Sequence, residues 1–205
     1  MKSLKLNSLV FPEVKVVRFG RYRDERGYFA ETFRRSDFDQ TGFLKETNLF
    51  QSNESYSQTN VIRGLHFQWN PYMGKLVRTM FGHMVDLILD IRLGSPNFGR
   101  IIAYDMPSKP EDDKAEWIWV PPGFAHGNFF LAPTMLEYVC SSEYNPNCEA
   151  GISPLATDID WSKCDQKIKQ QFDKIAASAI MTDKDRQGMN LAAWGKDPRS
   201  KNFTY

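Results

Sequence analysis

The chain has 205 residues, of which 41% are hydrophobic and 14% aromatic, and 26 basic residues against 25 acidic ones leave a net charge of +1. This length suits one domain with a sizeable core, and the aromatic content argues against intrinsic disorder. The balanced charge excludes the basic stripe of a nucleic-acid binder, and no apolar window approaches the ~18 residues of a membrane-spanning helix.

Short runs rich in Val, Ile, Leu and aromatic residues recur between residues 8 and 150 and predict a mainly β domain. Gly, Pro, Asn and Asp separate these runs, a spacing typical of a sandwich or barrel. The apolar run Leu87–Ile91 is expected at the centre of a sheet. The predicted strands are, in chain order, Val14–Phe19, Tyr28–Phe33, Leu76–Met80, Met84–Ile91, Ile101–Tyr104, Trp117–Val120 and Met135–Cys140.

One further strand-like run, Val61–Gln68, contains His66, and Lys75 follows at the entrance of the next apolar strand. Strands of this composition bury at least one face. Burying an imidazole and an ammonium costs desolvation energy unless both find partners. A binding pocket is therefore a good candidate, with an ordinary surface lysine at the strand entrance as the alternative for Lys75.

The character of the sequence changes near residue 156 and becomes polar and Lys-rich. Gln166–Ala179 is predicted to form a short amphipathic helix, and Trp194 is the expected anchor of the tail. We therefore predict a single domain over residues 1–205, with a β core at about 10–160 and a small helical appendage at 161–205.

The histidine pattern argues against a metal site. A double-stranded β-helix that binds a metal needs two or three histidines and a carboxylate at one end of the barrel. Only His66, His83 and His126 are available, and Gln68 stands where a metal-binding cupin usually has a second histidine. His83, next to Gly82, is predicted to lie exposed at a turn. His126 follows a Pro-Pro-Gly turn and is expected either as a structural histidine beside the pocket or as part of its lining.

The cysteine pattern favours a reduced, cytoplasmic setting. Cys140, Cys148 and Cys164 are odd in number and form no Cys-x-x-Cys pair, which argues against a disulfide framework and a thiolate zinc site. Each is expected to be a small, partly buried hydrophobe. Residues 1–6 also lack the long apolar stretch of a signal peptide.

Six segments that carry most of the polar motifs occur in one order along the chain. They are Asp24–Glu31, Gln51–Ser55, Arg63–Gln68, Gly74–Arg78, Asp90–Pro96 and Gly123–Gly127. Together they resemble the dTDP-4-dehydrorhamnose 3,5-epimerase family of nucleotide-sugar epimerases, over about residues 10–190. Six motifs in the same order identify a family far more specifically than any one motif does.

The resemblance implies a fold, an activity and a partner. Members are cupin-like β jelly rolls (double-stranded β-helices), usually homodimers that exchange N-terminal strands, and they use no metal and no dissociable cofactor. They act in deoxysugar biosynthesis on a nucleoside-diphosphate 4-keto-6-deoxyhexose, as in the conversion of dTDP-4-dehydro-6-deoxy-D-glucose to dTDP-4-dehydro-L-rhamnose. Inversion at C3 and C5 passes through enolates that the C4 ketone makes accessible.

The resemblance also implies roles for four catalytic residues. His66 matches the base, since a neutral imidazole accepts a proton near neutral pH. Asp185 is the expected carboxylate behind it, with Asp183 as the close alternative. Lys75 matches the lysine that stabilises charge on the ketone oxygen, and Tyr138 matches the acid on the opposite side of the sugar ring.

Seven further residues match the family's substrate contacts. Tyr144 resembles the aromatic residue that stacks on the nucleotide base, and His126 is expected to line the sugar pocket. Arg26 and Glu31 fall in the N-terminal portion that members pass to the neighbouring subunit. The pyrophosphate and ribose contacts are expected from Arg26, Gln51, Asn53 and Arg63, where arginine suits phosphate because its planar fork pairs two oxygens at once.

Two other functions stay open from the sequence. One is a single-carbon epimerase or ketoisomerase on a related nucleotide keto-sugar, including a keto-heptose; the other is a metal-binding or non-catalytic cupin. Bulky Trp69, Tyr72 and Met73 lie between His66 and Lys75, where they bear on access of the sugar. The tail after Asp185 has no role assigned from the sequence.

Overall fold

The computed structural model describes all residues, 1–205, and its strands form one continuous ten-stranded network plus a separate hairpin. Two sheets arise from the network: a first sheet ordered β1-β2-β9-β7-β11-β5 and a second sheet ordered β8-β7-β10-β6-β12. The strands are β1 (Lys5–Ser8), β2 (Lys15–Gly20), β3 (Tyr22–Asp24), β4 (Gly27–Phe29), β5 (Gln51–Ser57), β6 (Ile62–Gln68), β7 (Lys75–Asp90), β8 (Ile101–Ser108), β9 (Lys114–Val120), β10 (Phe124–Phe130), β11 (Thr134–Cys140) and β12 (Glu149–Gly151).

Strand β7 belongs to both sheets because it bends at Gly82. Its first half pairs with β9 and β11, and its second half pairs with β8 and β10. Gly82 has a φ of +104°, and a Cβ there would lie 2.3 Å from the carbonyl oxygen of Pro133, so a larger residue does not fit. The turn predicted at His83 is therefore wrong, and the predicted strands Leu76–Met80 and Met84–Ile91 are two halves of one strand.

Most other predicted strands are confirmed within a few residues, and the apolar run Leu87–Ile91 lies almost entirely in the centre of the second sheet. The prediction Tyr28–Phe33 is wrong beyond Phe29, where β4 ends. The chain leaves the hairpin there, and Trp117 Nε1 donates a hydrogen bond to the Thr32 carbonyl at 2.6 Å. Strands β5 and β10 lack the apolar alternation on which the prediction relied.

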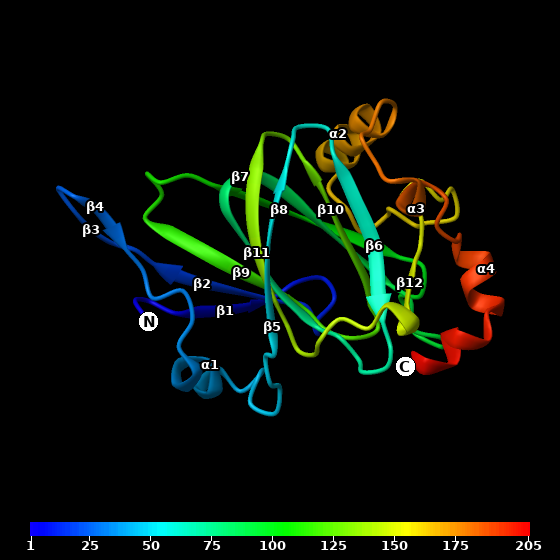
Figure 1. Cartoon of the computed structure of the whole chain (residues 1–205), viewed down its shortest axis with the longest axis horizontal. Helices are drawn as coiled ribbons and strands as arrows, with labels where there is room; N and C mark the ends of the chain where they lie inside the picture. The colour runs from blue at the N-terminus through cyan, green and yellow to red at the C-terminus, as the bar shows by residue number, and fades with distance from the viewer.

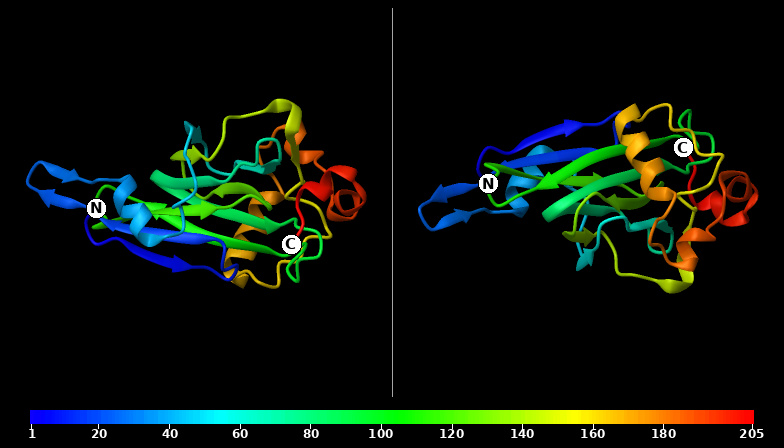
Figure 2. Two further views of the ribbon diagram at one scale, coloured as in Figure 1. Left: turned by 90° about the horizontal axis from the view of Figure 1, so that it is seen from below. Right: turned by 90° about the horizontal axis from the view of Figure 1, so that it is seen from above.

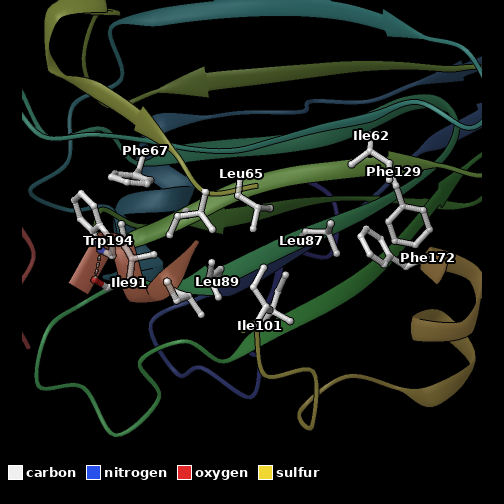
Figure 3. Close-up of a cluster of buried hydrophobic side chains, with 14 of the residues drawn as sticks. Ile62, Leu65, Phe67, Leu87, Leu89, Ile91, Ile101, Phe129, Phe172 and Trp194 are labelled. Carbon is white, nitrogen blue, oxygen red and sulfur yellow. Dashed lines mark hydrogen bonds between the residues drawn. The ribbon is translucent and has the colours of Figure 1, made fainter. Parts of the chain in front are cut away.

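Apolar side chains fill three layers. Residues such as Val77, Ile88 and Phe130 pack between the two sheets. A second cluster covers the outer face of the first sheet around Trp117. The largest cluster covers the outer face of the second sheet, where Leu65 packs; Figure 3 shows its side chains lying between the strands and the C-terminal helices.

The helices cover these outer faces. They are α1 (Arg35–Thr41), α2 (Gln166–Ala176), α3 (Asp183–Arg186) and α4 (Leu191–Lys196), with 3-10 turns η1 (Pro146–Cys148) and η2 (Pro198–Asn202). The predicted helix Gln166–Ala179 is confirmed as α2, which ends at Ala176 and buries Phe172 and Ile175. Trp194 is fully buried, as expected of an anchor, and its Nε1 donates to the Ile91 carbonyl at 3.1 Å.

The hairpin of β3 and β4 pairs with no other strand of the chain. It extends from the body at the end opposite the C-terminal helices (Figures 1 and 2). Phe29 on this hairpin is 66% exposed. No helix of the chain is long and apolar enough to cross a membrane, and all three cysteines are free thiols.

Candidate functional site

Two neighbouring cavities open between the two sheets, beside the apolar layer that joins them. One has a volume of about 300 Å³ and the adjoining one about 330 Å³, and they share His66, Lys75 and Tyr138 in their linings. Alternation along β6 explains the place of His66. Its neighbours Leu65 and Phe67 pack outward in the cluster around Trp194 (Figure 3), which turns His66 to the cavity side.

His66 pairs with Asp185 at the edge of the cavity. His66 Nε2 and Asp185 Oδ1 are 2.6 Å apart, and the Asp185 side chain is only 6% exposed. Burial acts to raise the pKa of Asp185, but the hydrogen bond and charge of His66 outweigh it and hold this pKa below its usual range. Of the two aspartates that the sequence left open, Asp185 makes the contact, while Asp183 is exposed.

Local structure fixes both partners of this pair. Thr182 caps α3, and its Oγ1 accepts the Asp185 N–H at 3.2 Å. On the other side, Gly151 of β12 stands opposite His66 in the sheet. A Cβ at Gly151 would lie 3.2 Å from His66 Cδ2, so the glycine leaves room for the imidazole ring.

Tyr138 lies on β11 of the first sheet and therefore faces His66 from the opposite wall. Its side chain is half-buried. Burial raises the pKa of the Tyr138 hydroxyl, and the positive charge of Arg63 acts in the opposite direction. The two walls of the cavity thus carry one base and one weak acid.

Lys75 is the first residue of β7 and lines both cavities. Burial lowers the pKa of its ammonium, and the carboxylates of Asp86 and Glu149 act in the opposite direction. A cation that is poorly solvated and aimed into a cavity interacts strongly with any negative charge that develops there.

His126 is both a structural histidine and part of the pocket lining, the two roles expected from the sequence. Its Nε2 lies 2.8 Å from Asp86 Oδ1, and both side chains are buried. Asn128 Nδ2 donates to the same oxygen at 3.3 Å. His126 and Asn128 also line the larger cavity, so His126 is hydrogen-bonded and faces the pocket.

The predicted substrate contacts divide into two groups. Gln51, Asn53 and Tyr144 line the smaller cavity, and Arg63 lines the larger one. Arg26 and Glu31 line neither cavity. They lie on or beside the projecting hairpin, where Arg26 is 84% exposed and pairs with Asp24, while Glu31 pairs with Arg34 and the N-terminal amine.

Several lining residues are not predicted as site residues from the sequence, among them Gln68, Glu149, Lys184 and Asn128. Gln68 lies in a visible motif but suggests only a metal ligand, and Glu149 and Lys184 give no local signal. Glu149 Oε1 accepts hydrogen bonds from the Tyr144 hydroxyl, at 2.8 Å, and from Lys184 Nζ. Nothing in the polar segment around Glu149 indicates that the fold returns it to the cavity. No group of three or more His, Cys, Asp and Glu side chains is clustered as metal ligands would be.

Known proteins similar to this chain share its family and its fold. The sequence profile described as dTDP-4-dehydrorhamnose 3,5-epimerase matches residues 8–193. A dTDP-4-dehydrorhamnose 3,5-epimerase of Sinorhizobium fredii is 34% identical over 178 residues, which cover 84% of this chain and 88% of that protein.

Solved structures give the same result. The dTDP-6-deoxy-D-glucose-3,5-epimerase of Legionella pneumophila, in complex with dTDP-4-keto-L-rhamnose, superposes with a TM-score of 0.79 at 29% identity, covering 98% of this chain and 97% of that one. A 3'-monoepimerase of Streptomyces bikiniensis, in complex with dTDP-quinovose, reaches a TM-score of 0.75 at 26% identity, covering 91% of this chain and 87% of that one.

Proposed function

This chain belongs to the dTDP-4-dehydrorhamnose 3,5-epimerase family, and on that basis we propose that it inverts C3 and C5 of a dTDP-linked 4-keto-6-deoxyhexose. The family makes it an isomerase with a cupin-like fold. The observation that carries the proposal is the placement of His66 and Tyr138 on opposite walls of one cavity, with Lys75 on the strand next to that of Tyr138 and in the same lining.

The residues fit a proton-exchange mechanism. The C4 ketone acidifies the hydrogens on C3 and C5, and neutral His66 removes one of them. Negative charge then moves to the ketone oxygen, where the Lys75 ammonium stabilises it. Tyr138 returns a proton from the other side of the ring, which inverts that carbon.

Asp185 acts behind the base. Its contact with His66 Nε2 keeps the proton on that nitrogen, so the other ring nitrogen is free to take the proton of the substrate. The carboxylate also stabilises the imidazolium that forms after the transfer. The lowered pKa of Asp185 keeps it ionised for this purpose.

Tyr138→Phe separates proton removal from inversion. Because His66 and Lys75 remain, we expect the variant to exchange substrate protons with solvent but to lose inversion at one carbon by about 10²-fold, a typical contribution of a positioned acid. NMR of the product formed in deuterated water measures both steps. Full epimerisation at both carbons would show that another group is the acid.

A single-carbon epimerase is the second candidate. The similarity to a 3'-monoepimerase favours it specifically, because closely similar folds carry both outcomes. In that case only one carbon exchanges in the unmodified enzyme. The same product analysis therefore distinguishes the two candidates.

We also propose a homodimer in which the β3–β4 hairpin enters the partner's site. The hairpin has no partner strand within the chain, and Tyr22, Tyr28 and Phe29 on it are exposed. Arg26, at its tip, is 84% exposed and lines neither cavity of its own chain. In the partner's cavity, its guanidinium would pair with the diphosphate.

Mixing two inactive variants tests the shared site. If Arg26 acts in the partner, dissociating and reassociating equal amounts of Arg26→Ala and His66→Ala proteins restores about a quarter of wild-type activity, since half of the dimers are mixed and each has one complete site. The matched control mixes His66→Ala with Lys75→Met, which both damage the same chain's cavity and restore nothing. No recovery in the first mixture would place Arg26 in its own chain or outside the site.

A further inference from the structure

The Tyr144 side chain combines an exposed ring with a tightly held backbone. The residue is 52% exposed and lines the smaller cavity. Exposed aromatic side chains on loops are ordinarily mobile. Here, however, the peptide groups on both sides of Tyr144 are hydrogen-bonded to side chains from other strands, which fixes the direction in which the ring leaves the loop.

Gln68 is the centre of this arrangement. Its side chain, 4% exposed, projects from β6 two residues after His66. Gln68 Nε2 donates to the Glu143 carbonyl at 3.0 Å, and Gln68 Oε1 accepts the Asn145 N–H at 2.8 Å. One amide therefore holds the residue before Tyr144 and the residue after it.

Three more contacts complete the support. Gln68 Nε2 also donates to the Pro71 carbonyl at 2.9 Å, which ties the loop after β6 to the same point. The Tyr144 N–H donates to Gln51 Oε1 at 2.8 Å. At the far end of the ring, the Tyr144 hydroxyl donates to Glu149. The backbone and the ring tip are thus both fixed before any ligand arrives.

We propose that Gln68 is a positioning residue that acts through Tyr144, by holding its ring ready to stack on the nucleotide base of the substrate. This rests on the proposed function, in which the cavity binds a dTDP-linked sugar. Preorganising an exposed aromatic ring lowers the ordering cost of binding. The same amide joins β6, the strand that carries the base His66, to the loop that carries the Tyr144 ring. It therefore fixes the spacing between the group that acts on the sugar and the ring that stacks on the nucleotide base.

A purely structural role for Gln68 makes different predictions. Any change to a buried, fully hydrogen-bonded amide destabilises the protein, because its partners lose their hydrogen bonds. Lower thermal stability alone is therefore uninformative. The informative quantities are the affinity for dTDP, the split between KM and kcat, and the dependence of both on Tyr144.

The experiment compares Gln68→Met, Tyr144→Ala and the double variant with the wild-type enzyme. Calorimetric titration with dTDP measures nucleotide affinity, and steady-state kinetics with dTDP-4-keto-6-deoxyglucose gives KM and kcat. Loss of the ring removes its stacking on the base, so Tyr144→Ala is expected to raise the Kd of dTDP about tenfold. Gln68→Met should raise Kd and KM in the same direction with kcat within about twofold, and the double variant should bind no more weakly than Tyr144→Ala.

Two further variants make the result decisive. Gln68→Asn keeps an amide but is too short to reach both Glu143 and Asn145, so it should weaken dTDP binding even if Gln68→Met folds poorly. Thr134→Val is the matched control: Thr134 is fully buried at the far end of β11, where its Oγ1 accepts the His83 N–H at 2.8 Å. It should lose stability while KM stays unchanged.

Additive losses in the double variant, or unchanged dTDP affinity in Gln68→Met and Gln68→Asn, would overturn this role for Gln68. Unchanged affinity in Tyr144→Ala would overturn it as well, because the Tyr144 ring would then not stack on the nucleotide base. In each of these cases wild-type turnover of the keto-sugar leaves the proposed function intact. Failure of the wild-type enzyme to act on that sugar would instead contradict the proposed function.

Discussion

His66→Ala is expected to lower epimerisation by about 10⁴-fold, the upper range for loss of a general base. It should also abolish exchange of the substrate protons at both carbons, because His66 is the only imidazole or carboxylate that lines both cavities. The fold should survive, since His66 faces the cavity and 32% of its side chain is exposed. NMR in deuterated water and a thermal melt measure the two effects.

His83 provides a closely matched control for this change. Its Nε2 lies 2.6 Å from Asp105 Oδ1, and its side chain is also 32% exposed. The two pairs therefore have the same distance and the two histidines the same exposure, while Asp105 is 48% exposed and Asp185 only 6%. The His83 pair lies on the outside of β7 and β8 and lines neither cavity at the site. His83→Ala should therefore keep full activity. Equal activity of the two alanine variants would remove His66 from the mechanism.

Lys75→Met is expected to lower turnover by about 10²–10³-fold, the loss typical of one group that stabilises an oxyanion. The same change should raise the melting temperature. Burial lowers the pKa of the Lys75 ammonium, which means that the folded protein holds this charge less favourably than the unfolded chain does. Methionine fills nearly the same volume without the charge.

The lowered pKa of Lys75 also predicts how the stability gain of Lys75→Met changes with pH. The folded pKa of Lys75 lies below its ordinary value of 10.5, so between those two values the unfolded chain binds more protons and stability rises with pH. The stability advantage of Lys75→Met should thus be largest near neutral pH and shrink as the pH approaches 10.5. A less stable methionine variant at neutral pH would show that the ammonium is well solvated or paired in the folded protein.

The apolar strands of the fold could be predicted because burial leaves a direct signal in composition. Leu87–Ile91 and the α2 segment are examples, since their spacing alone indicates which face is buried. The bend at Gly82 could not be predicted in this way. From the sequence alone, a glycine between two apolar runs indicates a turn. The need for glycine at position 82 comes from the Pro133 backbone, which lies too close for a side chain, and Pro133 is far away in the sequence.

From the residues alone, only His66 and Lys75 indicated a pocket, and the family motifs supplied the other site residues. His66 and Asp185 are 119 positions apart, and no local pattern indicates that their side chains meet. Gln68 differs, because it lies inside the visible motif Arg63–Gln68, but its proposed role depends on a contact with the distant loop that carries Tyr144. Arg26 and Glu31 remain predictions, since their proposed function requires a second copy of the chain.

The most direct test follows the substrate protons of dTDP-4-keto-6-deoxyglucose by NMR as the enzyme acts in deuterated water. We expect deuterium at both C3 and C5, with the L-rhamno configuration captured by a reductase that acts on the 4-keto product. Both labels should disappear in His66→Ala and persist in His83→Ala. Label at one carbon alone would contradict the 3,5-epimerase function and favour the single-carbon epimerase, and absence of label would contradict both.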